Sequence, residues 1–324
     1  MTYKNKKHLS ILLKVVILVL AAVFIYHKIS DNTNLRNFKT LTHSLDLTKV
    51  CITLSLVFLL MFFNWLLEAL KWRFLVREIE RISVWRSIES VFCGLTLAVF
   101  TPNRIGEYGG RVFFLSPKRR ILGIIAMAVG SVGQMVVTNV FGALAVLWFL
   151  KRFVAMDDSL YAALFVGGLG FCAFFILLYF KIRWLMDLLT NISFLKRFKK
   201  FFEILGRYKA STLFRVFLYC IARFVVFTSQ YCLLISMLIP QIPVFQMAMM
   251  VCILFFIQSA LPSLDLLDVG VRTLTASFFF SYITHQEVAI IAATAFIWLV
   301  NLIIPAILGV AFVFKLNFFG TNNN

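Results

Sequence analysis

The sequence predicts an all-α polytopic membrane protein with about six full transmembrane helices and two re-entrant broken helices. Of its 324 residues, 61% are hydrophobic and only 14% are charged, a balance too apolar for a soluble domain of this length. Several apolar runs reach the length of about 18 residues that spans a bilayer. Lys and Arg gather between these runs, so membrane topology, and not nucleic-acid binding, explains the formal net charge of +18.

Six apolar runs are long enough for complete crossings of the membrane. The first, 9–26, follows three lysines and has no small-residue cleavage site, so we expect an uncleaved span and not a signal peptide. Pro305 is expected to kink the last of the six. The other five spans are expected at 50–67, 121–150, 159–180, 211–239 and 286–314.

The distribution of basic residues orients these spans. With the N-terminus inside, the inner segments hold twenty Lys or Arg and the outer segments six, so both termini are expected in the cytoplasm. On the inner side, segment 68–89 mixes charged and apolar residues at helical spacing. We interpret it as an amphipathic helix on the membrane surface, with packing against the bundle as an equal alternative.

Two further apolar runs are short and end near a proline. The run 87–100 is followed by Pro102, and the run 244–261 by Pro262. A proline cannot continue a helix, and the residue before it is pushed toward an extended conformation. Since a short charged segment and more apolar residues follow each proline, segments 87–115 and 244–283 are expected to enter and leave the membrane on one side. Gly106, Gly109 and Gly110 in the first break permit tight turns or close helix approach.

The two breaks share a pattern of an acidic residue, a glycine and an arginine. The matching residues, 161 positions apart, are Glu107, Gly109 and Arg111 in the first break and Asp268, Gly270 and Arg272 in the second. In the expected topology one loop enters from inside and the other from outside. This predicts a single membrane domain, 1–324, built from an inverted repeat with halves of about 9–150 and 159–314, a design that places a binding site at the midplane. Two unrelated breaks are the alternative.

Charged residues at the breaks are the candidate site. Half-helix N-termini favour anions, and the guanidinium forks of Arg104 and Arg111 fit a phosphate. The four-residue spacing of Glu107 and Arg111 also fits a simple ion pair. The candidate substrate-binding residues are Pro102, Arg104, Glu107, Arg111, Arg223, Pro262, Asp265, Asp268 and Arg272.

Three of these candidates, Arg104, Asp265 and Arg223, have no expected local partner. The acidic excess of the second break, from Asp265 and Asp268, suits a cation, a proton or an amine. Arg223 lies about twelve residues into a span, where a charge is costly, and it is a possible partner for these acids.

The sequence carries few signs of catalysis or metal binding. It has no Walker, Rossmann or H-E-x-x-H motif, and its six cysteines and four histidines lack the spacing of a metal site, so no cofactor or metal is expected. Membrane glycosyltransferases work with one or two acidic residues in a loop. A catalytic role therefore stays open for Asp265 and Asp268, or for Asp31 and Asp46 in the outer segment.

With these residues in hand, the chain resembles the membrane domain of lysylphosphatidylglycerol synthases and the wider flippase-like family of prokaryotic membrane proteins. Pro102, Arg104, Gly106 and Glu107 match the first-half signature Pro-x-Arg-x-Gly-Glu of that family. The second-half signature is matched by Pro262 and by Gly270-Val271-Arg272, but it departs at Asp265-Leu266-Leu267, where a glycine pair is typical, and at Thr273, where an acidic residue is frequent.

The resemblance implies a protein of the bacterial cytoplasmic membrane that moves an anionic lipid between leaflets. The lipid would be a phospholipid or a polyprenyl-phosphate-linked molecule, with its headgroup bound as substrate. Synthase members of the family add a soluble aminoacyl-transferase domain; since the sequence ends at Asn324, that activity is not expected and the chain is predicted not to be an enzyme. A membrane-embedded glycosyl- or phospho-transferase and an accessory subunit of a lipid-modifying enzyme stay open, as does the oligomeric state.

Overall fold

The computed structural model describes residues 40, 45–99, 101, 104–181, 208–261 and 268–313. Within these residues the chain forms helices and no strands. Several predictions lie outside the described residues. They concern the first span at 9–26, Asp31, Pro102, Pro262, Asp265 and the side chain of Asp268.

Five long apolar helices form the frame of the structure, and each coincides with a predicted span. All five are long and apolar enough to cross a membrane. They are α3 (Leu47–Val76), α6 (Arg120–Phe153, preceded by a 3-10 turn), α7 (Asp158–Phe180), α10 (Ala210–Leu238) and the composite α13–α14 (Glu287–Val313). The prediction of a helical membrane protein is therefore confirmed for these five spans.

The prediction of an amphipathic surface helix over 68–89 is wrong. Helix α3 continues unbroken to Val76, and a short turn separates it from α4. Trp72 and Leu75 are each only 1% exposed, and even Lys71 is buried. Packing against the bundle, the alternative interpretation, accounts for these apolar residues because it buries them completely.

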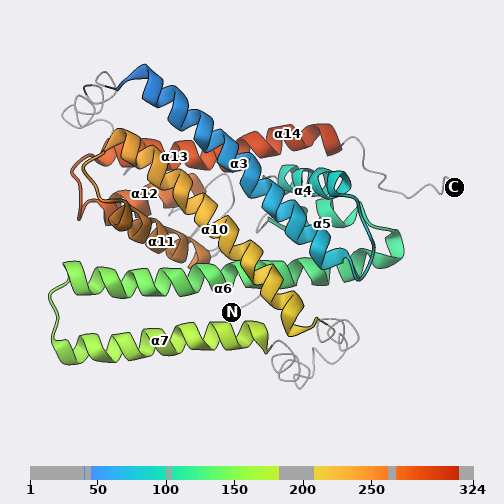
Figure 1. Cartoon of the computed structure of the whole chain (residues 1–324), viewed down its shortest axis with the longest axis horizontal. Helices are drawn as coiled ribbons and strands as arrows, with labels where there is room; N and C mark the ends of the chain where they lie inside the picture. The colour runs from blue at the N-terminus through green and yellow to red at the C-terminus, as the bar shows by residue number, and fades with distance from the viewer. Residues whose placement is uncertain are drawn as a thin grey trace, which may run out of the picture.

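Helices α3 and α10 pack along each other and cross the other helices (Figure 1). At one end of this pair the Tyr208 hydroxyl donates to the Leu75 carbonyl at 3.1 Å. Burial raises the pKa of Tyr208 to about 12, so this hydroxyl keeps its proton as a donor. In the interior, Gln230 donates to the Val57 carbonyl at 2.9 Å. The two contacts join segments far apart in sequence.

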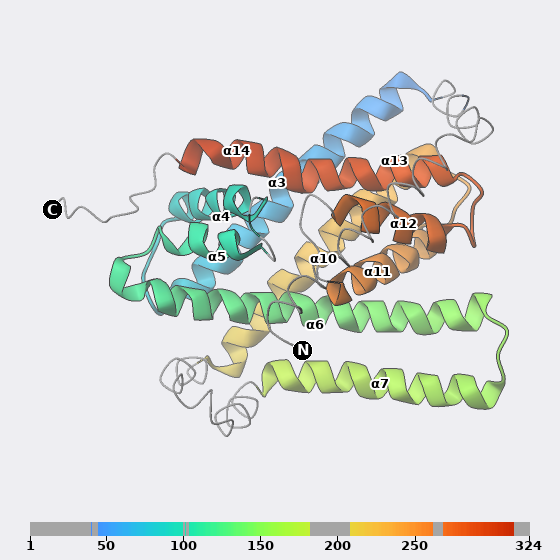
Figure 2. The same cartoon turned by 180° about the vertical axis from the view of Figure 1, so that it is seen from behind.

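The two proline-broken segments form pairs of short helices, as predicted. The first pair is α4 (Val84–Val99) and α5 (Ile105–Val112), and the second is α11 (Val244–Ala260) and α12 (Asp268–Phe280). Within each pair the helices pack on one another. Figures 1 and 2 show the α4–α5 pair toward one end of the long axis and the α11–α12 pair toward the other.

Two glycines bring α4 and α5 into direct contact. A Cβ atom added to Gly110 would lie 2.5 Å from the Cα atom of Gly94, and one added to Gly106 would lie 2.2 Å from the Leu97 carbonyl oxygen. Thr101 closes the turn, because its Oγ1 accepts from the Gly106 N–H at 2.7 Å. The predicted close helix approach at Gly106 and Gly110 is confirmed, whereas a Cβ at Gly109 would make only ordinary contact.

Each short-helix pair also packs against one of the five spans, from the other part of the chain. Helix α4 contacts α14 (Ile304–Val313), where a Cβ on Gly309 would lie 2.1 Å from the Phe92 carbonyl oxygen. Helix α11 contacts α6, where a Cβ on Gly142 would lie 2.3 Å from the Phe256 Cβ. Helices α4 and α11 each come first in a short-helix pair, and α6 and α14 each belong to the span that follows a pair. The two contacts therefore correspond in the element order.

The last span is interrupted close to the predicted position. Helix α13 (Glu287–Trp298) passes into a π-helical turn, Leu299–Ile303, before α14 begins. Pro305 cannot donate a backbone hydrogen bond, and its ring crowds the carbonyl four residues earlier, which is that of Asn301 within this wide turn.

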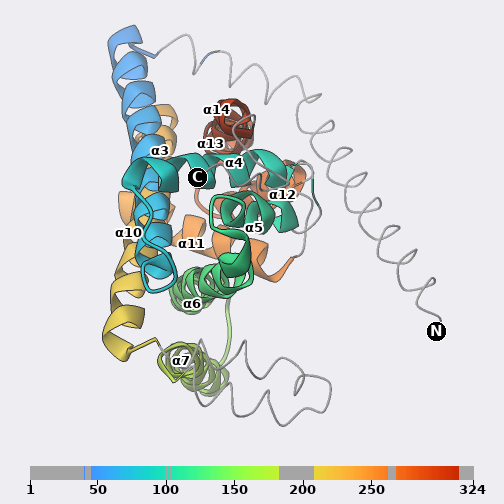
Figure 3. The ribbon, with the colours of Figure 1, turned by 90° about the vertical axis from the view of Figure 1, so that its right-hand side faces the viewer.

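The loops gather at two opposite ends of the bundle (Figure 1). One end holds the α3–α4 and α5–α6 turns and the start of α10; the other holds the α6–α7, α10–α11 and α12–α13 turns. Seen along the long axis, α7 lies at the periphery beside α6 (Figure 3). Most of its side chains are exposed, as suits a helix facing lipid.

We expect Gly110→Ala to lower the free energy of unfolding by about 1–3 kcal/mol, because the new methyl group forces α4 and α5 apart. The matched control is Gly170→Ala on α7, where a Cβ would meet nothing within 4 Å. Alanine favours a helix over glycine by up to about 1 kcal/mol, so the control is expected to keep or raise stability. Thermal unfolding in detergent micelles measures both. Equal midpoints for the two variants would contradict the close contact.

Candidate functional site

The Glu68 carboxylate is the centre of a buried ion cluster. Glu68 is 4% exposed and accepts from three cations on three helices. Arg111 of α5 contacts its Oε1 at 2.6 Å, and Lys71, one turn along α3, contacts its Oε2 at 2.7 Å. The third cation, Arg223 of α10, donates from Nη1 to the same Oε2.

Arg111 joins Glu68 to a second carboxylate. Its other terminal nitrogen donates to Glu107 Oε1, which confirms the predicted ion pair across one turn of helix. Arg111 is only 2% exposed and therefore lies behind the cluster, held by two acids. Since a buried charge is tolerated only when it is paired, this guanidinium positions both carboxylates.

Arg104 lies at the start of α5 in a left-handed backbone conformation, with φ 56° and ψ 27°. Among the described residues it is the only non-glycine residue with positive φ, a state that costs about 1 kcal/mol or more. The prediction that it has no local partner is wrong, because its Nε lies 3.0 Å from Glu107 Oε2. The left-handed turn folds Arg104 back over the first turn of its own helix, and its side chain stays 37% exposed.

The partners of Arg223 within the described residues all lie on one helix, and its suggested pairing with Asp265 or with the side chain of Asp268 falls outside the described part of the chain. It contacts Glu68, donates from Nε to Asn64 Oδ1 at 3.1 Å, and lies 5.3 Å from the centre of the Trp65 ring. All three partners belong to α3, because α10 packs along that helix. Sequence reasoning missed Glu68 after assigning it to a surface helix; its i,i+3 spacing from Lys71 was the available signal.

A cavity of about 480 Å³ lies beside the cluster. Helices α3, α5, α6, α10, α11 and α12 and the π-helical turn of the last span all contribute to it. The polar residues that line it are Asn64, Glu68, Lys71, Arg104, Glu107, Ser131, Gln134, Thr138, Arg223, Gln258, Ser259, Arg272 and Asn301. Four residues predicted for the site, Arg104, Glu107, Arg223 and Arg272, therefore meet at one cavity, with Arg111 directly behind. We name this space the central cavity.

The described surroundings of the central cavity are electropositive. The basic residues are Lys71, Arg104, Arg111, Arg223 and Arg272, and the acidic residues are Glu68 and Glu107. Among the described residues, five cations against two carboxylates leave an excess of three positive charges. In an apolar bundle such an excess is costly unless an anion compensates it.

Three residues that line the central cavity carry buried polar atoms without hydrogen-bond partners in the described part of the chain. In the described part of the chain, Gln134 Oε1, Gln258 Nε2 and Asn301 Oδ1 are buried and make no hydrogen bond. Buried polar atoms are nearly always paired in folded proteins. The lining of the central cavity is therefore polar as well as charged, with hydrogen-bonding capacity that the described residues leave unused.

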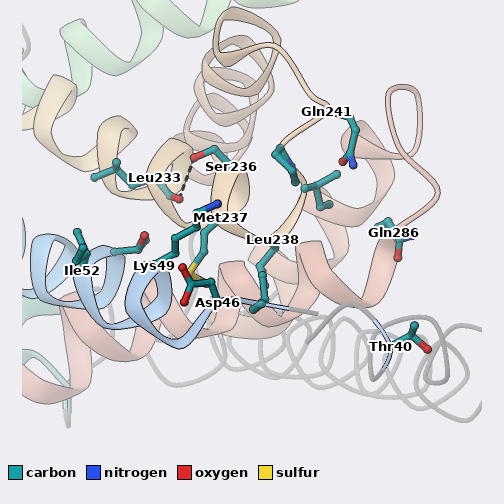
Figure 4. Close-up of a pocket in the computed structure, with 14 residues that line it drawn as sticks. Thr40, Asp46, Lys49, Ile52, Leu233, Ser236, Met237, Leu238, Gln241 and Gln286 are labelled. Atoms are coloured by element: carbon teal, nitrogen blue, oxygen red, sulfur yellow. Dashed lines mark hydrogen bonds between the residues drawn. The ribbon is translucent and has the colours of Figure 1, made fainter. Parts of the chain in front are cut away.

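A larger cavity, of about 830 Å³, lies at the other end of α3 and α10 (Figure 4). Its lining includes Asp46, Lys49 and Ser236, and the Ser236 hydroxyl donates to the Leu233 carbonyl at 3.0 Å. Asp46, which the sequence left open as a catalytic acid, accepts from the Thr48 N–H at 3.0 Å as the N-cap of α3. That contact accounts for Asp46 structurally, and the central cavity is the stronger candidate site.

An apolar helical bundle with a buried ion cluster beside a polar cavity defines an integral membrane protein with an internal site. The family model for the lysylphosphatidylglycerol synthase TM region matches residues 11–314, nearly the whole chain. The chain belongs to this family, which confirms the resemblance seen in the sequence. Comparisons with curated proteins and with solved structures gave no significant match.

Replacing Glu68 by Gln is expected to cost at least about 3 kcal/mol of stability, because three cations then lose their shared buried counter-ion. Glu78→Gln is the matched control, since the Glu78 side chain is 68% exposed, and we expect it to change stability by no more than about 0.5 kcal/mol. Thermal unfolding in detergent gives both values. A Glu68→Gln protein as stable as the control would show that the cluster does not hold the bundle together.

Proposed function

We propose that this protein is a lipid flippase-like transporter that moves an anionic lipid between membrane leaflets. The substrate class is a phospholipid or a polyprenyl-phosphate-linked lipid. Membership of a lipid-related membrane family supports this proposal. The observation that carries it is the excess of three positive charges among the described residues around the central cavity.

The chemistry of the central cavity favours an anionic headgroup. Arg104 and Arg272 reach it from the two broken segments, and Arg223 reaches it from α10. Arginine presents planar donors that match phosphate oxygens, and a phosphate would offset the positive excess. The volume of about 480 Å³ lies within the range of roughly 300–1,000 Å³ typical of small-ligand sites.

The arrangement of helices supports movement by alternating access. In the proposed inverted repeat, α3–α6 corresponds to α10–α14, and the two short-helix pairs enter the bilayer from opposite faces. The corresponding contacts of α4 with α14 and of α11 with α6 agree with this pairing. The central cavity would then open alternately to the two sides, as in other transporters with broken helices. Both termini would be cytoplasmic.

The transferase alternative receives less support from the described acids. Glu68 and Glu107 face the central cavity, but each is held by at least two cations. A general base needs a free lone pair and a pKa near the working pH. Pairing with two or more cations keeps a carboxylate ionised and engages its oxygens in hydrogen bonds. We therefore propose a transporter that does no covalent chemistry.

The test is a leaflet-translocation assay in proteoliposomes with fluorescent phosphatidylglycerol. Each charged hydrogen bond to a phosphate contributes about 1.5–3 kcal/mol, so Arg104→Ala and Arg272→Ala should each slow translocation by at least about tenfold. Arg104→Lys keeps the charge but loses the guanidinium fork, and a clear reduction is expected.

Arg77→Ala is the control for that assay. Arg77 lies just beyond the end of α3, and its side chain is 52% exposed, so normal translocation is expected. Normal rates for both Arg104→Ala and Arg272→Ala would refute the assignment of the site. A wild-type protein that translocates no lipid would shift the assignment to a transferase or an accessory subunit.

The proposed orientation has its own test in intact cells. Exposed Cys51 is first replaced by Ser, and single cysteines then replace Asp157 and Lys209, which are exposed at opposite ends of the bundle. A membrane-impermeant maleimide is expected to label Asp157→Cys from outside and to leave Lys209→Cys unlabelled until the cells are opened. The reverse pattern would invert the topology.

A further inference from the structure

A second space, almost wholly apolar, lies next to the central cavity. It has a volume of about 590 Å³ and runs between α6, α10 and α11, with Phe141, Ala248 and Cys252 among its lining residues. Apart from three hydroxyl groups its lining side chains are apolar, and none is charged. We name this space the apolar groove.

One aromatic ring separates the apolar groove from the central cavity. Phe224 of α10 lines both spaces. On the groove side its ring stacks on Phe141, with centroids 5.0 Å apart and planes inclined by 19°. On the cavity side it meets Phe255 edge-on at 5.7 Å. The two spaces therefore share a thin aromatic wall.

The other edge of the apolar groove lies on the outer surface of the bundle. Four of its lining residues are well exposed: Phe141 at 38%, Leu144 at 40%, Val225 at 52% and Val244 at 63%. In a membrane, lipid chains cover such a surface. Three successive residues of α10 thus lead outward: Arg223 in the ion cluster, Phe224 in the wall and Val225 facing lipid.

We propose that the apolar groove holds the hydrocarbon chain of the anionic lipid whose headgroup occupies the central cavity. The inference rests on the proposed function and extends it to the tail of the substrate. A positively charged cavity beside an uncharged groove, with only Phe224 shown between them, matches one molecule that carries both an anion and a long apolar chain. Apolar contact in the groove favours the chain, while the arginines select the headgroup.

The bilayer itself favours this occupant over a protein segment. A groove that opens sideways among lipid chains is reached by a chain that never leaves the hydrocarbon region, whereas a peptide there would have to satisfy every backbone polar group internally. Phe224 is the side chain that must turn for the headgroup and the chain to lie in their two spaces at once.

The experiment uses the full-length protein in proteoliposomes and a phosphatidylglycerol with a photoreactive diazirine at the middle of one acyl chain. Mass spectrometry of the cross-linked peptides locates the chain. We expect labelling of buried groove residues, including Cys252, which is 7% exposed. Phosphatidylcholine with the same photoreactive chain is the probe control and should label only the exposed surface, such as α7.

Ala248→Trp fills the apolar groove and should reduce labelling of its buried residues at least about tenfold. This is the factor expected when about two CH₂ groups of the lipid chain can no longer be buried there. Leu169→Trp on the exposed face of α7 is the matched control and should leave groove labelling unchanged. The wild-type labelling pattern tests the proposal even if Ala248→Trp folds poorly. Cross-links confined to the outer surface, or equal groove labelling by phosphatidylcholine, would overturn it.

Translocation of fluorescent phosphatidylglycerol in the same proteoliposomes separates the two proposals. Translocation without groove labelling would refute the groove assignment and leave the transporter standing. Groove labelling without translocation would support the groove as a lipid-binding site and refute the transporter.

Discussion

The structure depends on the neutralisation of charge around Glu68. A carboxylate buried in an apolar bundle would be strongly unfavourable by itself, and so would each of the cations that meet it. The cluster brings Arg111 from α5 and Arg223 from α10 to one side chain of α3. Because each charge is acceptable only with its partners in place, the cluster specifies how three helices, distant in sequence, lie against one another.

The same cluster also determines the charge that surrounds the central cavity. Within the described residues the two carboxylates of the site, Glu68 and Glu107, are already engaged, and five cations surround them. A ligand that enters the central cavity therefore meets an electropositive surface held in place by a saturated network. A rigid network behind a partly exposed arginine is the arrangement expected of a preorganised anion site.

Much of the fold was predictable because apolar length and proline position are local signals. The five described spans, the two broken segments and the pair Glu107–Arg111 follow from runs, breaks and helical spacing alone. The partners of Arg223 and Arg104 were not predictable, since they depend on which helices pack together and on a left-handed residue. Glu68 was missed for a related reason. A helix at a membrane surface and a helix in a buried charged core have the same sequence pattern of mixed charged and apolar residues.

The glycine contacts of the short-helix pairs have a mechanical consequence. Gly309 of α14 lies against α4, and Gly142 of α6 lies against α11, so each pair is seated on a long helix from the opposite half of the proposed repeat. Helices packed this closely slide or separate only with a large loss of contact. The bodies that tilt as rigid units would therefore not be the two halves read along the chain. They would be mixed assemblies, α4–α5 moving with α14 and α11–α12 moving with α6, about the α3–α10 pair that crosses both.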